Sequence, residues 1–120
     1  MDMESFHQYC LLKAGTEESF PFDENVLVYK VGGKMFAATN INSEGFIINL
    51  KCNPERALQL REAYPEIEPG YHMNKKHWNS VDCEGSLPNR LLKDLIDHSY
   101  DLVFKSLKKI DRNTLLSQDR

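Results

Sequence analysis

The sequence has few cysteines, no surplus of positive charge and no long apolar run. Its cysteines, Cys10, Cys52 and Cys83, are odd in number and form no CxxC pair, which argues against a disulfide framework or a structural zinc site and favours buried thiols. No segment approaches the roughly 20 apolar residues that cross a bilayer. The start MDMESFHQYC also lacks the pattern of a secretory signal. We therefore expect a cytoplasmic protein with no membrane role.

The formal net charge of −3 is the wrong sign for a dedicated duplex-DNA binder. The charge is unevenly spread, however. Residues 1–24 carry six acids and one base, whereas residues 25–80 carry seven bases and five acids. A basic patch outside the first segment is therefore compatible with the acidic total.

Phosphate-binding loops of the GxxxxGK[ST] or GxGxxG type are also missing. The glycine pair Gly32-Gly33 instead lies inside VLVYKVGGKMFAA, between two runs of β-forming residues. Paired glycines suit the positive φ angles of a two-residue hairpin turn. We expect a hairpin at 26–38 rather than a nucleotide site.

The remaining pattern predicts one α+β domain. Residues 3–13 read as a helix capped by Asp2, and TEESFPFDEN reads as a loop whose Phe20 and Phe22 plug the edge of the core. GFIINLKC reads as a third strand, and ERALQLREAY as a helix capped by Asn53. A hairpin at 70–82 and a long helix from Pro88 follow.

The helix from Pro88 carries the strongest apolar stripe in the chain and is expected to pack on the sheet. The expected order is α-βββ-α-ββ-α, a two-layer fold with an antiparallel sheet and helices on one side. The domain should span residues 1–109, and residues 110–120 should form a frayed tail. The stripe consists of Leu91, Leu92, Leu95, Ile96, Tyr100, Val103, Phe104 and Leu107.

Several short words occur in a fixed order along the chain: FPF at 20–22, VYKVGGKMFA at 28–37, LKCNPE at 50–55 with LR at 60–61, PGYHMNKKHW at 69–78 and LIDHSYDLV at 95–103. Together they resemble the MmcQ/YjbR family of small bacterial proteins over most of the domain. The resemblance implies a CyaY-like or secretion-chaperone-like fold. It also implies DNA binding through a proposed double-wing arrangement, and it transfers no catalytic residue.

The stretch GYHMNKKHWNSV at 70–81 concentrates histidine, lysine and asparagine. A two-residue turn at 75–76 would place alternate side chains on opposite faces of the hairpin, with a bulge or strand end at Val81. A slip of one residue would exchange the faces. The core face would then hold Tyr71, Met73 and Trp78, and the polar face His72, Asn74, His77 and Asn79.

This hairpin is the candidate nucleic-acid site. Lysines attract phosphate, and asparagine and histidine hydrogen-bond bases and phosphates. Lys30, Lys34 and Lys51 could add charge if they lie on the same side of the sheet, but Lys30 and Lys34 should point to opposite faces and so should not both contribute. The plainer reading is a solvated hairpin whose asparagines hold the turn. The residues expected to contact DNA are His72, Asn74, Lys75, Lys76 and His77.

The sequence gives less support to two other functions, a metal site and a reactive thiol. A metal at His72 and His77 would need a third ligand, such as Asp82 or Glu84, at a spacing that matches no common site. Cys52 precedes a helix start, where a thiol pKa can fall, but no histidine is placed near it by the sequence.

We therefore expect a monomer that is not an enzyme and needs no cofactor. Weak DNA binding is the leading role. The alternative is a protein-interaction or chaperone-like module that uses a sheet face or the acidic first segment.

Overall fold

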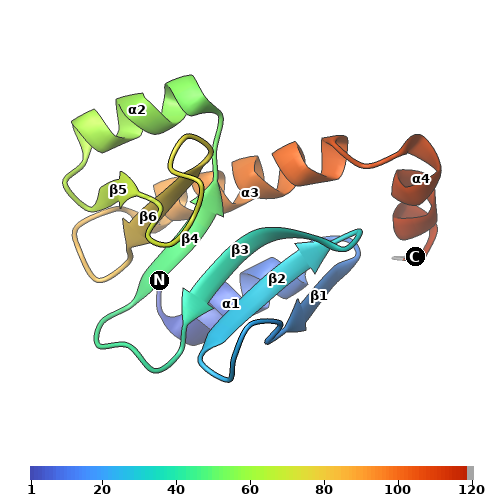
Figure 1. The fold of residues 1–120 in the computed structure, drawn as a ribbon, viewed down its shortest axis with the longest axis horizontal. Coiled ribbons are helices and arrows are strands. Elements are labelled where there is room, and N and C mark those ends of the chain that lie inside the picture. Colours follow the sequence, from blue (N-terminus) through green and yellow to red (C-terminus); the bar gives the residue numbers. More distant parts are fainter. Residues whose placement is uncertain (119–120) are drawn as a thin grey trace.

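The computed structural model describes residues 1–118 and shows one six-stranded antiparallel sheet with helices against it (Figure 1). The α+β class and the antiparallel sheet confirm the sequence prediction, although two elements were missed. The elements in chain order are α1 (Met3–Leu11), β1 (Thr16–Ser19), β2 (Val26–Val31), β3 (Lys34–Asn40), β4 (Ile47–Lys51), α2 (Pro54–Ala63), β5 (Ile67–Pro69), β6 (Trp78–Asp82), α3 (Asn89–Lys105) and α4 (Lys109–Gln118).

The strands lie in the order β1-β2-β3-β4-β6-β5. Helices α1 and α3 lie behind the sheet in Figure 1, and α2 adds its buried side chains to the same core. The opposite face of the sheet is turned toward the viewer. We call this second surface the open face.

Local capping chemistry sets the helix starts. The carboxylate of Asp2 accepts a hydrogen bond from the N–H of Ser5 at 2.8 Å at the start of α1. The side chain of Asn53 accepts hydrogen bonds from the first N–H groups of α2, one of them at 3.0 Å from Glu55, and Pro54 takes the first helical position. Both caps were predicted from the sequence and are confirmed.

The glycine pair forms the predicted turn between β2 and β3. Gly32 and Gly33 have φ angles of +58° and +78°, the left-handed values that this turn requires. A Cβ on Gly32 would lie 2.6 Å from the side chain of Leu107, whereas nothing lies within 4 Å of a Cβ on Gly33. Only the first glycine is therefore also needed for packing.

An aromatic chain runs through the core from α1 to α3. The ring of Phe6 meets Tyr29 edge-on at a centroid distance of 5.3 Å, and Phe36 meets Tyr100 in the same way at 5.3 Å. Edge-to-face pairs of this kind stabilise beyond their buried area. The stripe predicted on α3 is confirmed as core by the burial of Leu92, Leu95, Ile96, Tyr100 and Val103.

The strand β1 corrects the predicted loop TEESFPFDEN. Its polar residues have no apolar alternation, and what holds them is backbone pairing with β2, from Thr16 opposite Val31 to Ser19 opposite Val28. The aromatic residues after β1 do not plug the core either. Phe20 is 46 % exposed and Phe22 is 71 % exposed.

The helix α4 corrects the frayed tail predicted for residues 110–120. Leu115 packs against the core beside Gly15, where an added Cβ would lie 2.6 Å from its side chain. Arg112 donates to the carbonyl oxygens of Lys105 and Leu107 and ties α4 to the end of α3. The last two positions of the predicted tail, 119–120, lie outside the described residues. Within residues 1–118, no helix has both the length and the apolar character of a membrane span.

Candidate nucleic-acid interface

Strand register decides which side chains point to the open face. Lys51 pairs with Trp78, and Asn49 pairs with Ser80, so these four residues share one face. Their intervening neighbours face the helices, as the burial of Ile48, Leu50 and Val81 in the core shows. Lys30 shares the open face with Val28 by alternation along β2.

The region 70–82 is not the two-residue hairpin that the sequence predicts. Strand β5 ends at Pro69, β6 begins at Trp78, and residues 70–77 form a loop between them. The N–H of Gly70 donates to the carbonyl oxygen of Trp78 at 2.8 Å and closes this loop. A Cβ on Gly70 would lie 2.8 Å from the Cβ of Trp78, so the close approach depends on glycine.

The change of register overturns the predicted faces. Pro69, not His72, lies opposite Asn79. Asn79 is 2 % exposed instead of solvent-facing, and Tyr71 is 71 % exposed instead of buried. Strand β6 also runs through Val81 without the expected break, because Val81 and Asn79 both face the helices.

Hydrogen bonds within the loop hold its shape. The side chain of Asn74 accepts from the N–H of Lys76 at 3.0 Å, and its carbonyl oxygen accepts from the N–H of His77 at 3.2 Å. The ammonium of Lys75 donates back to the carbonyl oxygen of Gly70 at 3.0 Å. Asn74 thus holds the turn, which is the plainer role that the sequence allowed.

Arg61 on α2 fixes the loop from the other side of the sheet, and sequence reasoning did not single it out. Its Nε donates to the side-chain oxygen of Asn79 at 2.6 Å. Its Nη2 donates to the carbonyl oxygens of Lys75 and, at 3.2 Å, Trp78. The sequence offered Arg61 only as part of the motif LR at 60–61 and placed Asn79 on the polar face, so it gave no signal that the two are partners.

The structure brings the predicted site residues together on this one loop. His72, Asn74, Lys75 and Lys76 are exposed, and His77 is half-buried. His72 has a φ of +58°, which is uncommon for a residue with a side chain. The carbonyl oxygen of His77 accepts from the N–H of Cys52 at 2.8 Å, which places Lys51 beside the loop.

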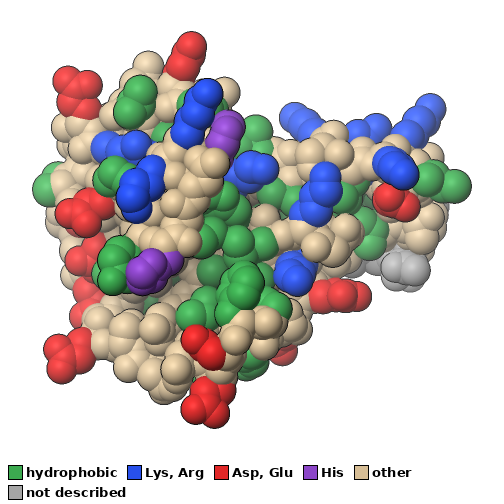
Figure 2. Space-filling model, in the orientation of Figure 1, with side chains coloured by type: hydrophobic (Ala, Val, Ile, Leu, Met, Phe, Trp, Pro, Cys, Tyr) green, Lys and Arg blue, Asp and Glu red, His purple; other side chains and the backbone are tan. Residues whose placement is uncertain are grey.

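The open face is electrostatically divided. Figure 2 looks onto it and shows Lys and Arg side chains across its middle and upper part and, at the right, over the end of α3 and α4, with most Asp and Glu toward the left and lower edges. Lys34 does not belong to the open face, because its ammonium approaches the hydroxyl of Ser106 at the end of α3. The basic residues that register and exposure assign to the open face and its loop are Lys30, Lys51, Lys75 and Lys76.

A groove of about 400 Å³ lies beside the loop on the open face. At its floor the N–H of Tyr71 donates to Ser80 Oγ at 3.0 Å, and that hydroxyl donates to the side-chain oxygen of Asn49 at 2.5 Å. The groove is lined by Asn40, Ser43, Ile47, Asn49, Glu68, Pro69, Tyr71, Lys75 and Ser80.

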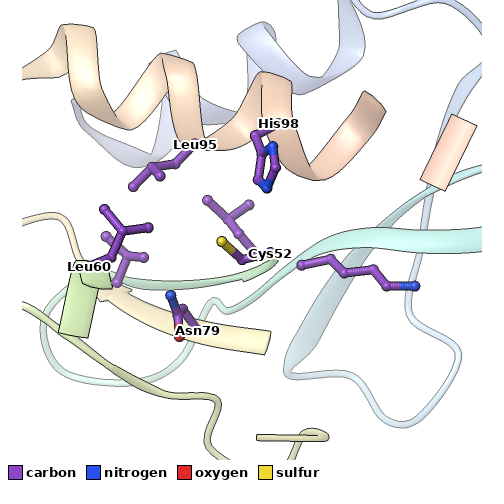
Figure 3. Close-up of a pocket in the computed structure, with 8 residues that line it drawn as sticks. Cys52, Leu60, Asn79, Leu95 and His98 are labelled. Atoms are coloured by element: carbon purple, nitrogen blue, oxygen red, sulfur yellow. The ribbon is translucent and has the colours of Figure 1, made fainter. Parts of the chain in front are cut away.

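On the helix side, the structure supplies the histidine that the sequence could not place near Cys52. Figure 3 shows His98 of α3 pointing toward the thiol of Cys52, with Asn79 across the cavity. The cavity holds only about 10 Å³, about the smallest space that accepts one water. A substrate therefore has no room beside the thiol.

The protonation states also disfavour a nucleophile at this cavity. Burial raises the pKa of the Cys52 thiol, although Arg56 and Arg61 act in the opposite direction. Burial, followed by the charge of Arg56, lowers the pKa of His98. The Nε2 of His98 already accepts a hydrogen bond from the N–H of Asn53 at 3.1 Å, so it is not free to take a proton.

The sequence also left open a metal at His72 and His77. Across residues 1–118, no three His, Cys, Asp or Glu side chains gather closely enough to hold a metal ion.

Comparison with known proteins gives a family and a set of relatives. The family model described as YjbR matches residues 11–102. The chain is 40 % identical to the uncharacterized protein YbdF of Escherichia coli O157:H7, over 93 % of this chain and 95 % of that protein. It is 33 % identical to the uncharacterized protein YjbR of Escherichia coli K12, over 97 % of this chain and 98 % of that protein.

A solved structure supports the same relation. The chain is similar to protein DR2400 of Deinococcus radiodurans, whose domain is described as DUF419, with a TM-score of 0.88 and 41 % identity. The match covers 93 % of this chain and 86 % of that protein.

Proposed function

The chain belongs to the YjbR family, and from that premise we propose that it is a DNA-binding protein that contacts phosphates with the basic part of its open face. The observation that carries the proposal is that Lys51 lies on the same part of the surface as Lys75 and Lys76. Lys51 lies on β4 next to the loop that presents the other two. We propose that the protein acts as a monomer in the cytoplasm, without cofactor or catalysis.

The five residues predicted from the sequence take unequal roles in this proposal. Lys76 is exposed, and Lys75 donates to Gly70 but keeps two further N–H donors for phosphate. His72 and His77 supply hydrogen bonds from the same loop. Asn74 contributes through its NH₂ group, since its oxygen already holds the turn.

Binding by this surface should be weak. Few lysines take part, and the whole chain repels phosphate with its net charge of −3. The acidic residues toward the edges of the open face also restrict a nucleic acid to the basic band. Low salt is therefore the condition that reveals the interaction.

Fluorescence anisotropy of labelled DNA at low and at physiological salt tests the proposal. The Lys75→Glu/Lys76→Glu variant should lose binding. The control variant Arg90→Glu/Lys93→Glu makes the same change of charge at exposed positions of α3, away from the open face, and should keep most of it. Equal loss in both variants would show that only net charge matters and would contradict the proposed surface.

A specific observation favours protein binding as the second candidate. Phe20, Phe22 and Ile41 expose large apolar side chains, and the N–H of Ile41 donates to the carbonyl oxygen of Asn25, which joins the turn after β3 to the segment between β1 and β2. An interface built on these groups would respond little to salt, whereas phosphate contacts weaken steeply with salt.

A further inference from the structure

The groove on the open face contains hydrogen-bond donors that have no partner in the part of the chain that the structure describes, and a network of other hydrogen bonds fixes their orientation. The hydroxyl of Ser80 accepts a hydrogen bond from the backbone N–H of Tyr71 and donates one to the side-chain oxygen of Asn49. The NH₂ group of Asn49 is therefore the last group of this hydrogen-bond network. Among residues 1–118, no hydrogen bond from that NH₂ group is found. Asn49 therefore offers its two N–H donors to whatever enters the groove.

A hydrogen-bond acceptor, the carboxylate of Glu68, lies on the other side of Ser80 in the floor of the groove. Glu68 pairs with Ser80 in the sheet, as Asn49 does from the opposite neighbouring strand. Asn49 and Glu68 therefore flank Ser80 on one face, about 10 Å apart between Cα atoms at the usual strand spacing. Donors from one side and a carboxylate from the other match the mixed donor and acceptor edge of a nucleobase.

An aromatic ring completes the groove. Tyr71 lines it and is 71 % exposed, and its ring lies 4.0 Å from the ring of His72 between centroids. Bases stack on exposed aromatic rings of this kind when they are unpaired. Lys75 lines the same groove and carries a charge suited to the adjoining phosphate.

We propose that this groove binds an unpaired nucleobase, so that the nucleic acid bound by the open face is single-stranded. The proposal rests on the DNA binding proposed above and names its substrate class. In a duplex the Watson–Crick edge of each base is paired with its partner and the faces of each base are stacked, so Asn49 could not bind that edge and Tyr71 could not stack on the ring. The volume of about 400 Å³ falls in the usual range for small-ligand pockets, ~300–1,000 Å³.

The test compares a labelled single strand and the duplex of the same sequence by anisotropy at low salt. The wild type should bind the single strand more tightly. Tyr71→Ala should weaken single-strand binding by about fivefold or more, from the usual contribution of one stacked base, and change duplex binding little. Tyr71→Phe should restore the affinity because it keeps the ring. Phe22→Ala removes an aromatic side chain of equal exposure outside the groove and should have no effect.

The outcomes separate this inference from the function on which it rests. Duplex binding as tight as single-strand binding, lost in Lys75→Glu/Lys76→Glu but unchanged in Tyr71→Ala, would overturn the groove and leave DNA binding intact. An equal effect of Phe22→Ala and Tyr71→Ala would also overturn it. No binding of either DNA at low salt would overturn both.

Discussion

Arg61 is the residue on which the shape of the candidate interface depends. It links α2 to the buried side chain of Asn79 and to the backbone of the loop at 70–77. Its guanidinium can serve three acceptors at once because its donors lie in one rigid plane. The loop that presents Lys75 and Lys76 is thus held from the helix side of the sheet.

Arg61→Ala should lower the free energy of unfolding by about 1–3 kcal/mol, since it leaves the buried oxygen of Asn79 without its donor. Chemical denaturation measures this change, and amide exchange should rise across residues 70–77. The control is Arg56→Ala, which removes only a partly exposed ion pair with Asp94 and should cost below about 1 kcal/mol. Equal costs for the two variants would show that Arg61 does not hold the loop.

The cysteines should be inert in the folded protein. All three are buried, and burial raises the pKa of Cys10 and of Cys83 to about 12. A thiol reagent at neutral pH should therefore modify none of them until denaturant is added, after which all three react. One thiol that reacts quickly in the native state would point to Cys52 and would revive the catalytic alternative.

The same thiols should make the fold sensitive to alkali. The pKa of Cys10 and Cys83 is higher in the folded chain than the ordinary 9.0, so the folded state holds their protons more tightly. Their stabilisation is complete below about pH 9 and is lost as the pH rises toward 12. The free energy of unfolding should thus fall between pH 9 and 11. Cys83→Ala should make that fall shallower, and a flat profile in the wild type would contradict the assignment.

Among the elements, the hairpin of β2 and β3 offers a matched pair of substitutions. Gly33→Ala should cost about 1–2 kcal/mol of stability, the usual penalty for a side chain in the left-handed region. Gly32→Ala should cost clearly more, because its Cβ also displaces Leu107. Thermal or denaturant unfolding measures both. The turn geometry would be wrong if Gly33→Ala proved the more damaging change.

Elements with a strong local signal could be predicted from the sequence. Asp2, Asn53 and the glycine pair each satisfy a local backbone requirement, and the structure places them as expected. The stripe on α3 was equally clear, because a whole helix face repeats it. Strand β1 and helix α4 were missed, since backbone pairing with β2 and packing of Leu115 near Gly15 are long-range contacts without a local pattern.

The predicted register of β5 and β6 was wrong for a similar reason. The sequence offered alternating side chains through GYHMNKKHWNSV, and the lysine pair seemed the natural tip. The alternation was misleading because Asn79 is a polar residue on the core side, satisfied by Arg61 from a distant helix. The five candidate residues nevertheless lie together, since they are neighbours in sequence on one loop. Asn49 and Tyr71 gained their relevance only from the sheet, which also places Lys51, whose side the sequence left open, next to the loop.

Across the whole molecule, charge is separated more sharply than the total of −3 suggests. Acidic residues are concentrated in the first 24 positions, and basic side chains form a band in Figure 2 that crosses the open face and continues over the end of α3 and α4. The open face is left without a helix layer because α1, α2 and α3 all contribute to the core behind the sheet. A basic sheet face that no helix within residues 1–118 covers is what makes phosphate binding the favoured proposal.

The salt dependence of DNA binding tests this account most directly. For single-stranded DNA the slope of log affinity against log salt should be about −0.7 for each phosphate contact. One contact each from Lys51, Lys75 and Lys76 therefore predicts a slope of about −2. Lys51→Ala, Lys75→Ala and Lys76→Ala should each reduce the slope by about one contact, while Lys93→Ala on α3 leaves it unchanged. A slope near zero in the wild type, or one that none of the three open-face substitutions changes, would contradict phosphate binding by this face.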